Sequence, residues 1–118
     1  MPLKPIKTKE RFENLIKTPR GVVTYAEHKK TPVPDLEHVI LLDDLAIYWY
    51  AYYVLHRRWP KGEQILLRGA FPIWGPNAYV LNRYAENIIK NRWPEAEPFI
   101  KKDSSEWENY SNNFNIQD

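Results

Sequence analysis

Cysteine is absent from this sequence, and glycine is scarce. The 118 residues contain no Cys and only four Gly. Without Cys there is no disulfide, no thiolate nucleophile and no zinc or iron–sulfur site with Cys ligands. The four Gly are scattered, so no glycine-rich loop is present to cradle a phosphate group. These absences exclude several classes of enzyme and metalloprotein.

Net charge and long apolar runs are also in short supply. The formal net charge is only +2 at pH 7, unlike the strongly basic balance of most nucleic-acid-binding domains. The uncharged stretch from Leu45 to Leu55 is about half of the roughly 20 residues that span a bilayer, so we expect no transmembrane helix and no membrane partner. The basic N-terminus is not followed by the apolar segment of a signal peptide. We therefore expect an intracellular, cytoplasmic protein.

Aromatic residues are abundant instead. Five Trp, eight Tyr and four Phe make up 14% of the chain, far more than a disordered segment contains. A length of 118 residues is close to the commonest domain size. We therefore expect residues 1–118 to fold as a single domain.

Two dipeptides, Tyr-Ala and Trp-Pro, recur nine residues apart, with Arg before the Trp. These copies are Tyr50-Ala51 with Arg58-Trp59-Pro60 and Tyr84-Ala85 with Arg92-Trp93-Pro94. Tyr25-Ala26 and Tyr110-Ser111 are weaker matches, and the four Tyr residues are spaced by 25, 34 and 26 residues. Self-similarity at such a period is typical of proteins that stack repeated structural units.

Helix signals recur in the same register. Seven residues before each Tyr stands a residue type whose side-chain oxygen caps a first helical turn: Thr18, Asp43, Asn77 and Asp103. A second marker is Glu, a variable residue and two apolar residues, beginning at Glu13, Glu37, Glu63 and Glu97. Each unit is therefore predicted to contain a short helix, a tight connection and a longer helix centred on the Tyr.

The predicted fold is all-α, a solenoid-like array of four stacked helix pairs. The expected helices cover residues 8–17, 19–30, 34–42, 44–58, 60–68, 77–91, 94–102 and 104–114. The expected units are 8–30, 34–58, 60–91 and 94–114, with an insertion at 69–76. Strands at 21–25 and 39–42 are possible on propensity, but the shared register favours helices. We expect Tyr25, Tyr50, Tyr84 and Tyr110 to occupy equivalent positions between neighbouring units.

The third unit carries a resemblance to a known type of sequence. Residues 84–100 read Tyr-Ala-Glu-Asn-Ile-Ile-Lys-Asn-Arg-Trp-Pro-Glu-Ala-Glu-Pro-Phe-Ile and are followed by Asp103. They resemble the Tyr-Ala…Arg-Trp-Pro-Glu-Ala-Glu-Pro short tandem repeat of uncharacterised bacteriophage and bacterial proteins. The second unit matches less closely, with Lys61-Gly62-Glu63-Gln64 in place of the Glu-Ala-Glu-Pro run. The resemblance implies a phage or bacterial setting and a helical repeat array, and it supplies no catalytic residue.

Residues that could carry chemistry form no recognisable constellation. The three His fall at different places in the repeat and offer no i, i+4 pair to a metal ion. The Ser residues of the last unit have no neighbouring His that could activate them. The carboxylate pairs Asp43-Asp44 and Glu95/Glu97 are better explained as caps and solvated helix starts than as acid–base pairs. We expect no enzymatic activity, no metal site and no cofactor.

Departures from the repeat are better candidates for function. The insertion from Gly69 to Pro76 lengthens one unit, and its apolar side chains include Phe71, Ile73 and Trp74. A loop this apolar either folds back over the groove between units or presents these side chains to a partner.

A second departure is the aromatic surplus of the predicted helix 44–58. Beyond its inward stripe, this helix carries Tyr48, Trp49, Tyr52 and Tyr53. One face packs on the adjoining units, whereas the other needs the insertion, a second copy of the chain or another protein to cover it. We expect a turn in the insertion to bring Trp74 within reach of Trp49 or Tyr53.

Two functions from different classes follow. The first is a non-catalytic protein-binding module that uses the insertion and the aromatic helix face, and the resemblance suggests a phage-encoded factor that modulates or inhibits a host-defence protein. The alternative is a nucleic-acid-associated accessory protein that uses the basic N-terminal segment with Arg57 and Arg58. That segment contains Lys4, Lys7, Lys9 and Arg11. For Arg58 and Arg92, a cation–π contact with the following Trp is a competing role.

Overall fold

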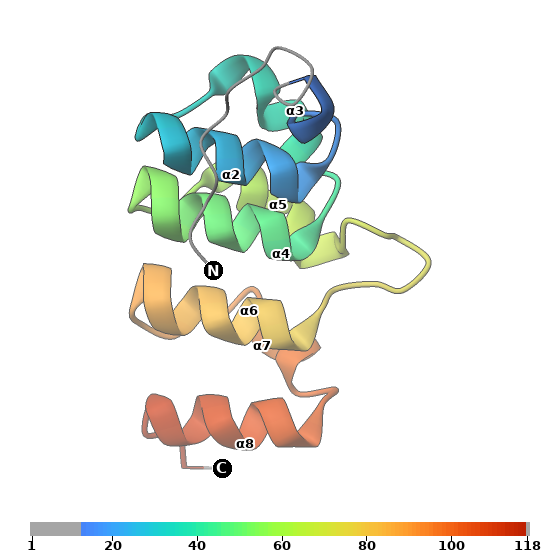
Figure 1. Ribbon diagram of the computed structural model, residues 1–118. Helices are drawn as coiled ribbons and strands as arrows, with labels where there is room; N and C mark the ends of the chain where they lie inside the picture. The colour runs from blue at the N-terminus through green and yellow to red at the C-terminus, as the bar shows by residue number, and fades with distance from the viewer. Residues whose placement is uncertain (1–12, 118) are drawn as a thin grey trace.

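The computed structural model describes residues 13–117, and every regular element in that range is helical (Figure 1). The long helical segments begin with α2 (Pro19–Lys29), α4 (Asp44–Trp49), α6 (Ala78–Tyr84) and α8 (Ser104–Asn113), and α4 and α6 each continue into a π-helix. Figure 1 shows them side by side in one row, running in the same direction. The predicted all-α class is confirmed for these residues, and strands at 21–25 and 39–42 are wrong.

Shorter elements form a second row behind the first. They are a 3-10 turn η1 (Pro34–Leu36), α3 (Glu37–Ile40), α5 (Pro60–Arg68) and α7 (Glu97–Ile100). The helix predicted over 60–68 is confirmed, whereas those over 34–42 and 94–102 are shorter than predicted because their first residues form tighter turns. Of the helix predicted over 8–17, residues 13–15 are helical, and residues 8–12 lie outside the described range.

All four predicted N-caps are confirmed. In each case the side-chain oxygen accepts a hydrogen bond from the backbone N–H three residues later, which satisfies an amide that the first helical turn leaves unpaired. The oxygen-to-nitrogen distances are 3.0 Å at Thr18, 3.1 Å at Asp43, 3.2 Å at Asn77 and 3.1 Å at Asp103.

The long helices end earlier than predicted, and the last turns of two of them are π-helical. α4 continues into the π-helix η2 (Tyr50–Leu55), and α6 continues into the π-helix η3 (Ala85–Ile89). His56 and Lys90 then adopt left-handed backbone conformations, with φ of 55° and 61°. The helices predicted to reach residues 58 and 91 therefore stop two or three residues short, because a left-handed residue turns the chain out of the helix.

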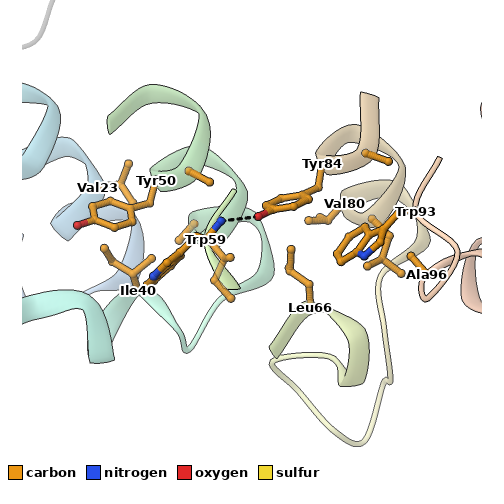
Figure 2. Close-up of a cluster of buried hydrophobic side chains, with 14 of the residues drawn as sticks. Val23, Ile40, Tyr50, Trp59, Leu66, Val80, Tyr84, Trp93 and Ala96 are labelled. Atoms are coloured by element: carbon orange, nitrogen blue, oxygen red, sulfur yellow. Dashed lines mark hydrogen bonds between the residues drawn. The ribbon is translucent and has the colours of Figure 1, made fainter. Parts of the chain in front are cut away.

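The hydrophobic core runs along the interface between the two rows. Its largest fully buried side chains are Tyr110 and three that Figure 2 shows, Trp93, Tyr50 and Tyr84. The molecule measures 54 × 28 × 25 Å, and its radius of gyration is 15.5 Å. A globular domain of this length has a radius of about 13.5 Å, so the fold is elongated. None of the described helices has the length and apolar composition of a membrane span.

Candidate functional site

The Tyr84 hydroxyl lies at the centre of a buried polar contact between α6 and the chain that enters α5. It accepts a hydrogen bond from the Trp59 backbone N–H at 2.8 Å (Figure 2) and donates one to Glu63 Oε2 at 2.7 Å. Arg58 donates two further hydrogen bonds to the same carboxylate, at 2.9 and 2.6 Å. One hydroxyl from α6 thus binds both a backbone amide and a carboxylate at the start of α5.

The same contact occurs one unit further along the chain. The Tyr110 hydroxyl accepts from the Trp93 N–H at 2.7 Å and donates to Glu97 Oε2 at 2.8 Å. Arg92 donates to both oxygens of Glu97, at 2.9 and 2.8 Å. The interpretation of Glu97 as part of a solvated helix start is wrong, because this residue is only 8% exposed and holds three hydrogen bonds.

A third copy lacks the arginine. The Tyr50 hydroxyl accepts from the Val33 N–H at 3.0 Å and donates to Glu37 Oε2 at 2.7 Å. Pro32 stands where the other copies have Arg. Tyr50, like Tyr84 and Tyr110, is completely buried, whereas Tyr25 is partly exposed.

Arg58 and Arg92, which precede the two Trp residues, bind the carboxylates of Glu63 and Glu97. A cation–π contact of Arg58 or Arg92 with the following Trp was one alternative from the sequence. The structure instead directs both guanidinium groups onto glutamates, in two-point ion pairs. Such paired hydrogen bonds fix geometry better than a single contact.

Burial and the neighbouring groups fix the protonation states of the contacts. Burial, together with the bonds to glutamate, raises the pKa of Tyr110 to about 12 and raises the pKa of Tyr84 as well. Burial alone would raise the pKa of Glu63, but hydrogen bonds from Arg58 and Tyr84 outweigh it, and the net effect lowers the pKa. The tyrosines therefore stay protonated donors and the glutamates stay ionised acceptors at neutral pH, which suits a structural role rather than proton transfer.

The side chains of the insertion are strongly exposed. The exposed fraction is 55% for Phe71, 89% for Ile73 and 83% for Trp74. Figure 1 shows the loop between α5 and α6 extending away from both rows. Of the two alternatives left by the sequence, the insertion presents its apolar residues outward rather than covering the groove between units.

The aromatic face of α4 and η2 divides into an inner and an outer pair. Tyr52 and Tyr53 are exposed, and their rings meet edge to face at 4.8 Å. Tyr48 and Trp49 are only partly exposed: the Tyr48 hydroxyl accepts from Asn87 Nδ2 at 2.8 Å, and the Trp49 ring lies under the Arg20 guanidinium. The inner pair thus has partners within the chain.

Trp74 lies near the opposite end of α4 and η2 from Tyr53, so the expected approach to Tyr53 is wrong, whereas an approach to Trp49 stays a prediction. Trp74 shares a hollow with Asp44, the first residue of α4, whereas Tyr53 lies nine residues further along the same helical segment. Nine helical residues separate the two ends by about 14 Å. The loop leaves the molecule on the side where the long helices begin, so it cannot fold back onto their far ends (Figure 1).

Two adjoining hollows lie at the far ends of the long helices. The first has a volume of about 380 Å³ and is lined by residues that include Tyr52, Tyr53, His56, Arg57, Asn87 and Lys90. The second has a volume of about 390 Å³ and includes Lys30, Tyr53 and His56. Sequence reasoning did not group Lys30, His56 and Lys90 as one site. They could have been found by extending the repeat alignment five or six residues beyond each Tyr.

The described part of the chain, residues 13–117, contains no cluster of three His, Cys, Asp or Glu side chains able to hold a metal ion. Of the basic residues proposed for nucleic-acid contact, Arg57 is exposed, and Arg58 is bound to Glu63. Lys4, Lys7, Lys9 and Arg11 lie outside the described range.

Comparison with models of protein families, with curated proteins and with solved structures found no match to this chain.

Proposed function

We propose that the protein is a helical-repeat array that binds another protein through the insertion between α5 and α6 and catalyses no reaction itself. The single observation that carries this proposal is the exposure of Ile73 and Trp74, which are 89% and 83% exposed on a loop that leaves the helices. Exposed apolar side chains gathered in one segment mark interaction sites more often than they mark ordinary surface.

The remainder of the molecule suits a rigid support for this loop. Tyr50, Tyr84 and Tyr110 make the same pair of hydrogen bonds in successive units. A residue that recurs in every unit usually makes the contact that every unit needs, which supports the repeat arrangement. Recognition is then left to residues that do not recur.

The chemistry of the loop indicates an apolar recess on the partner. Burying one Trp side chain removes about 150–250 Å² from water and is worth roughly 4–6 kcal/mol before the costs of association. Trp is also enriched among the few residues that dominate binding energy at protein interfaces. Because the Trp74 side chain is 83% exposed, a recess on the partner could receive it without disturbing the helices.

The biological setting rests on the resemblance of residues 84–100 alone. It supports a phage-encoded factor that modulates or inhibits a host-defence protein in the bacterial cytoplasm. The partner's identity is therefore best sought in bacterial extracts.

The test is affinity capture from a nuclease-treated bacterial lysate with three immobilised forms of the chain. They are the unmodified protein, Trp74→Ala, and Tyr79→Ala as a matched control. Tyr79 is an aromatic residue of α6 that is 52% exposed and lies outside the loop. We expect a protein retained by the unmodified chain and by Tyr79→Ala and lost by Trp74→Ala, with a binding cost of about 2 kcal/mol or more.

Thermal unfolding of the same variants shows whether a loss of binding results from unfolding of the variant. Because Trp74 is exposed, its replacement should change stability by no more than about 0.5 kcal/mol. Retention of every captured protein by Trp74→Ala would refute the proposal, as would a large fall in its melting temperature. Self-association that depends on Trp74, measured by sedimentation, would identify a second copy of the chain as the partner.

A further inference from the structure

The long helices end at left-handed residues that are not glycine. The positions are Lys30, His56, Lys90 and Asn115, with φ between 54° and 61°. Glycine is the usual residue in this conformation because a side chain strains it, and Asn is the best tolerated alternative. Lys is neither, and His adopts this conformation more often than most residues but less readily than glycine, so backbone geometry alone favours glycine at all three positions. Strain retained at equivalent places invites a functional explanation.

The three strained residues lie along one groove. Lys30 and His56 line one hollow, His56 and Lys90 line the next, and Tyr53 and His56 belong to both. Neighbouring helices are spaced by about 8–10 Å, so the groove from Lys30 to Lys90 is about 20 Å long. It crosses the ends of α2, η2 and η3.

The charged side chains that line the groove are predominantly positive. Lys30, Arg57 and Lys90 line it, and within residues 13–117 none of the three forms an ion pair with a carboxylate. Glu27 is the acidic residue among those lining the two hollows. Cations at helix C-termini also interact favourably with the helix dipole, but that interaction does not require the left-handed position itself.

Exposed aromatic rings stand among these cations. Tyr52 is 41% exposed and Tyr53 is 52% exposed, and both line the first hollow. A positively charged groove with accessible aromatic rings is the arrangement that binds single-stranded nucleic acid, since phosphates pair with the cations and bases stack on the rings. An acidic peptide would use the cations and leave the rings unused.

We propose that this groove binds a short single strand of nucleic acid, with phosphates on Lys30, Arg57 and Lys90 and a base on Tyr52 or Tyr53. The inference deepens the nucleic-acid alternative considered from the sequence, and it places the contact at the helix ends rather than at Arg58. It does not depend on the insertion, which lies at the opposite side of the molecule.

The test measures binding of a fluorescein-labelled 12-nucleotide oligothymidylate by fluorescence anisotropy at several salt concentrations. The informative variant is Lys30→Gly combined with Lys90→Gly. Glycine is favoured at both positions, so the variant loses two cations without backbone strain and is expected to stay folded. We expect its affinity to fall at least tenfold at low salt. The slope of log affinity against log salt should become shallower by about 1.4, or 0.7 for each lost phosphate contact.

Two control variants isolate the groove. Asn115→Gly makes the same kind of backbone change at the fourth left-handed position without removing a cation. Lys102→Ala removes one positive charge near Asp103, on the side of the molecule that carries the insertion. Both should bind the oligonucleotide as the unmodified protein does. A separate Tyr53→Ala variant should weaken binding at all salt concentrations without changing the slope.

Three results would overturn the proposal. One is no measurable binding of the oligonucleotide by the unmodified protein at low salt. Another is equal loss of affinity in Lys102→Ala, which would indicate non-specific attraction to total charge. The third is preferential binding of polyglutamate with the same dependence on Lys30 and Lys90, which would assign the groove to an acidic peptide. The Trp74→Ala variant should bind the oligonucleotide normally, so failure here and failure of the protein-binding proposal are distinguishable.

Discussion

At the scale of single residues, each buried tyrosine hydroxyl makes two hydrogen bonds at once. The Tyr84 hydroxyl accepts a hydrogen bond from a backbone N–H and donates one to an ionised carboxylate. A buried polar group without a hydrogen-bond partner destabilises the fold. Loss of one such contact would therefore lower the free energy of unfolding mainly because a buried amide and a carboxylate would each lose a partner. Two hydrogen bonds from Arg58 to Glu63 then link the buried contact to a half-exposed guanidinium group.

Replacing Tyr84 by Phe should therefore lower the stability considerably, although it removes a single oxygen atom. The ring would still fill the same space, but the Trp59 N–H and the Glu63 carboxylate would each lose a partner. We expect the free energy of unfolding in urea to fall by about 1–3 kcal/mol. Tyr53→Phe removes the same atom from an exposed ring and should change stability by less than about 0.5 kcal/mol. Equal effects of the two substitutions would contradict the structural role assigned to the Tyr84 hydroxyl.

Sequence reasoning succeeded for residues whose partners are local. Asp43 and Asn77 were identified as caps because a cap needs only the amide three residues later. The tyrosines were expected merely to fill space between units. Their glutamate partners lie 13 residues away in two copies and 21 in the other, since the insertion separates Glu63 from Tyr84. That change of spacing hides the pairing from any fixed-interval pattern.

At the scale of elements, close approach of α5 to α4 depends on the absence of a side chain at Gly62. A Cβ at this position would lie 2.6 Å from Ile47 Cγ2 and 2.6 Å from the Trp59 ring. Ile47 is completely buried, so it has little room to move aside. Ala96, at the corresponding place before Glu97, is likewise small and fully buried.

Gly62→Ala should thus destabilise the protein although it improves helix propensity. Alanine in a helix interior gains about 1 kcal/mol over glycine, while overpacking a tight contact costs about 1–3 kcal/mol. We expect a lower melting temperature for Gly62→Ala and an almost unchanged one for Lys61→Ala, its exposed neighbour. A gain in stability from Gly62→Ala would mean that α4 and α5 separate readily.

The π-helical turns were not predicted, for a reason that also lies at this scale. An apolar stripe of period 3.6 continues almost unchanged through a single wider turn, so hydrophobic periodicity does not register η2 or η3. The wider turn is visible in the backbone hydrogen bonds: the Lys90 N–H donates to the Ala85 carbonyl, five residues earlier, at 2.7 Å.

At the scale of the whole molecule, the insertion is a loop whose two ends lie close together between α5 and α6. An ideal Cβ at Gly69 would lie 2.2 Å from the Gly75 carbonyl oxygen, so the two ends of the loop nearly touch. Of the other three connections, the first places the cap five residues after the glutamate, and the remaining two place it six residues after, as from Glu97 to Asp103. Removing residues 69–76 gives Glu63 and Asn77 the same interval.

Deletion of residues 69–76 should leave the helices folded. The main loss is the hydrogen bond from the Ala70 N–H to Asp44 Oδ1, while shortening a loop recovers some closure entropy. We expect thermal unfolding to change by about 1 kcal/mol or less and capture of the protein partner to disappear. Far-ultraviolet circular dichroism and the oligonucleotide assay provide the controls, and both should match the full chain. Loss of helical signal would show that the insertion is needed for folding.

The buried tyrosine contacts join residues that are close in the sequence, which affects how fast the chain folds. The amides and hydroxyls that they join are 17, 25 and 17 residues apart, and the main contacts among the described helices are between neighbours in the two rows. Closing such short segments loses little chain entropy, and proteins dominated by local contacts fold in microseconds to milliseconds. Each contact can also open without breaking the next. Amide protons near α2 and α8 should therefore exchange with solvent faster than those of α4 and α6, in a gradient from the ends of the row to its centre.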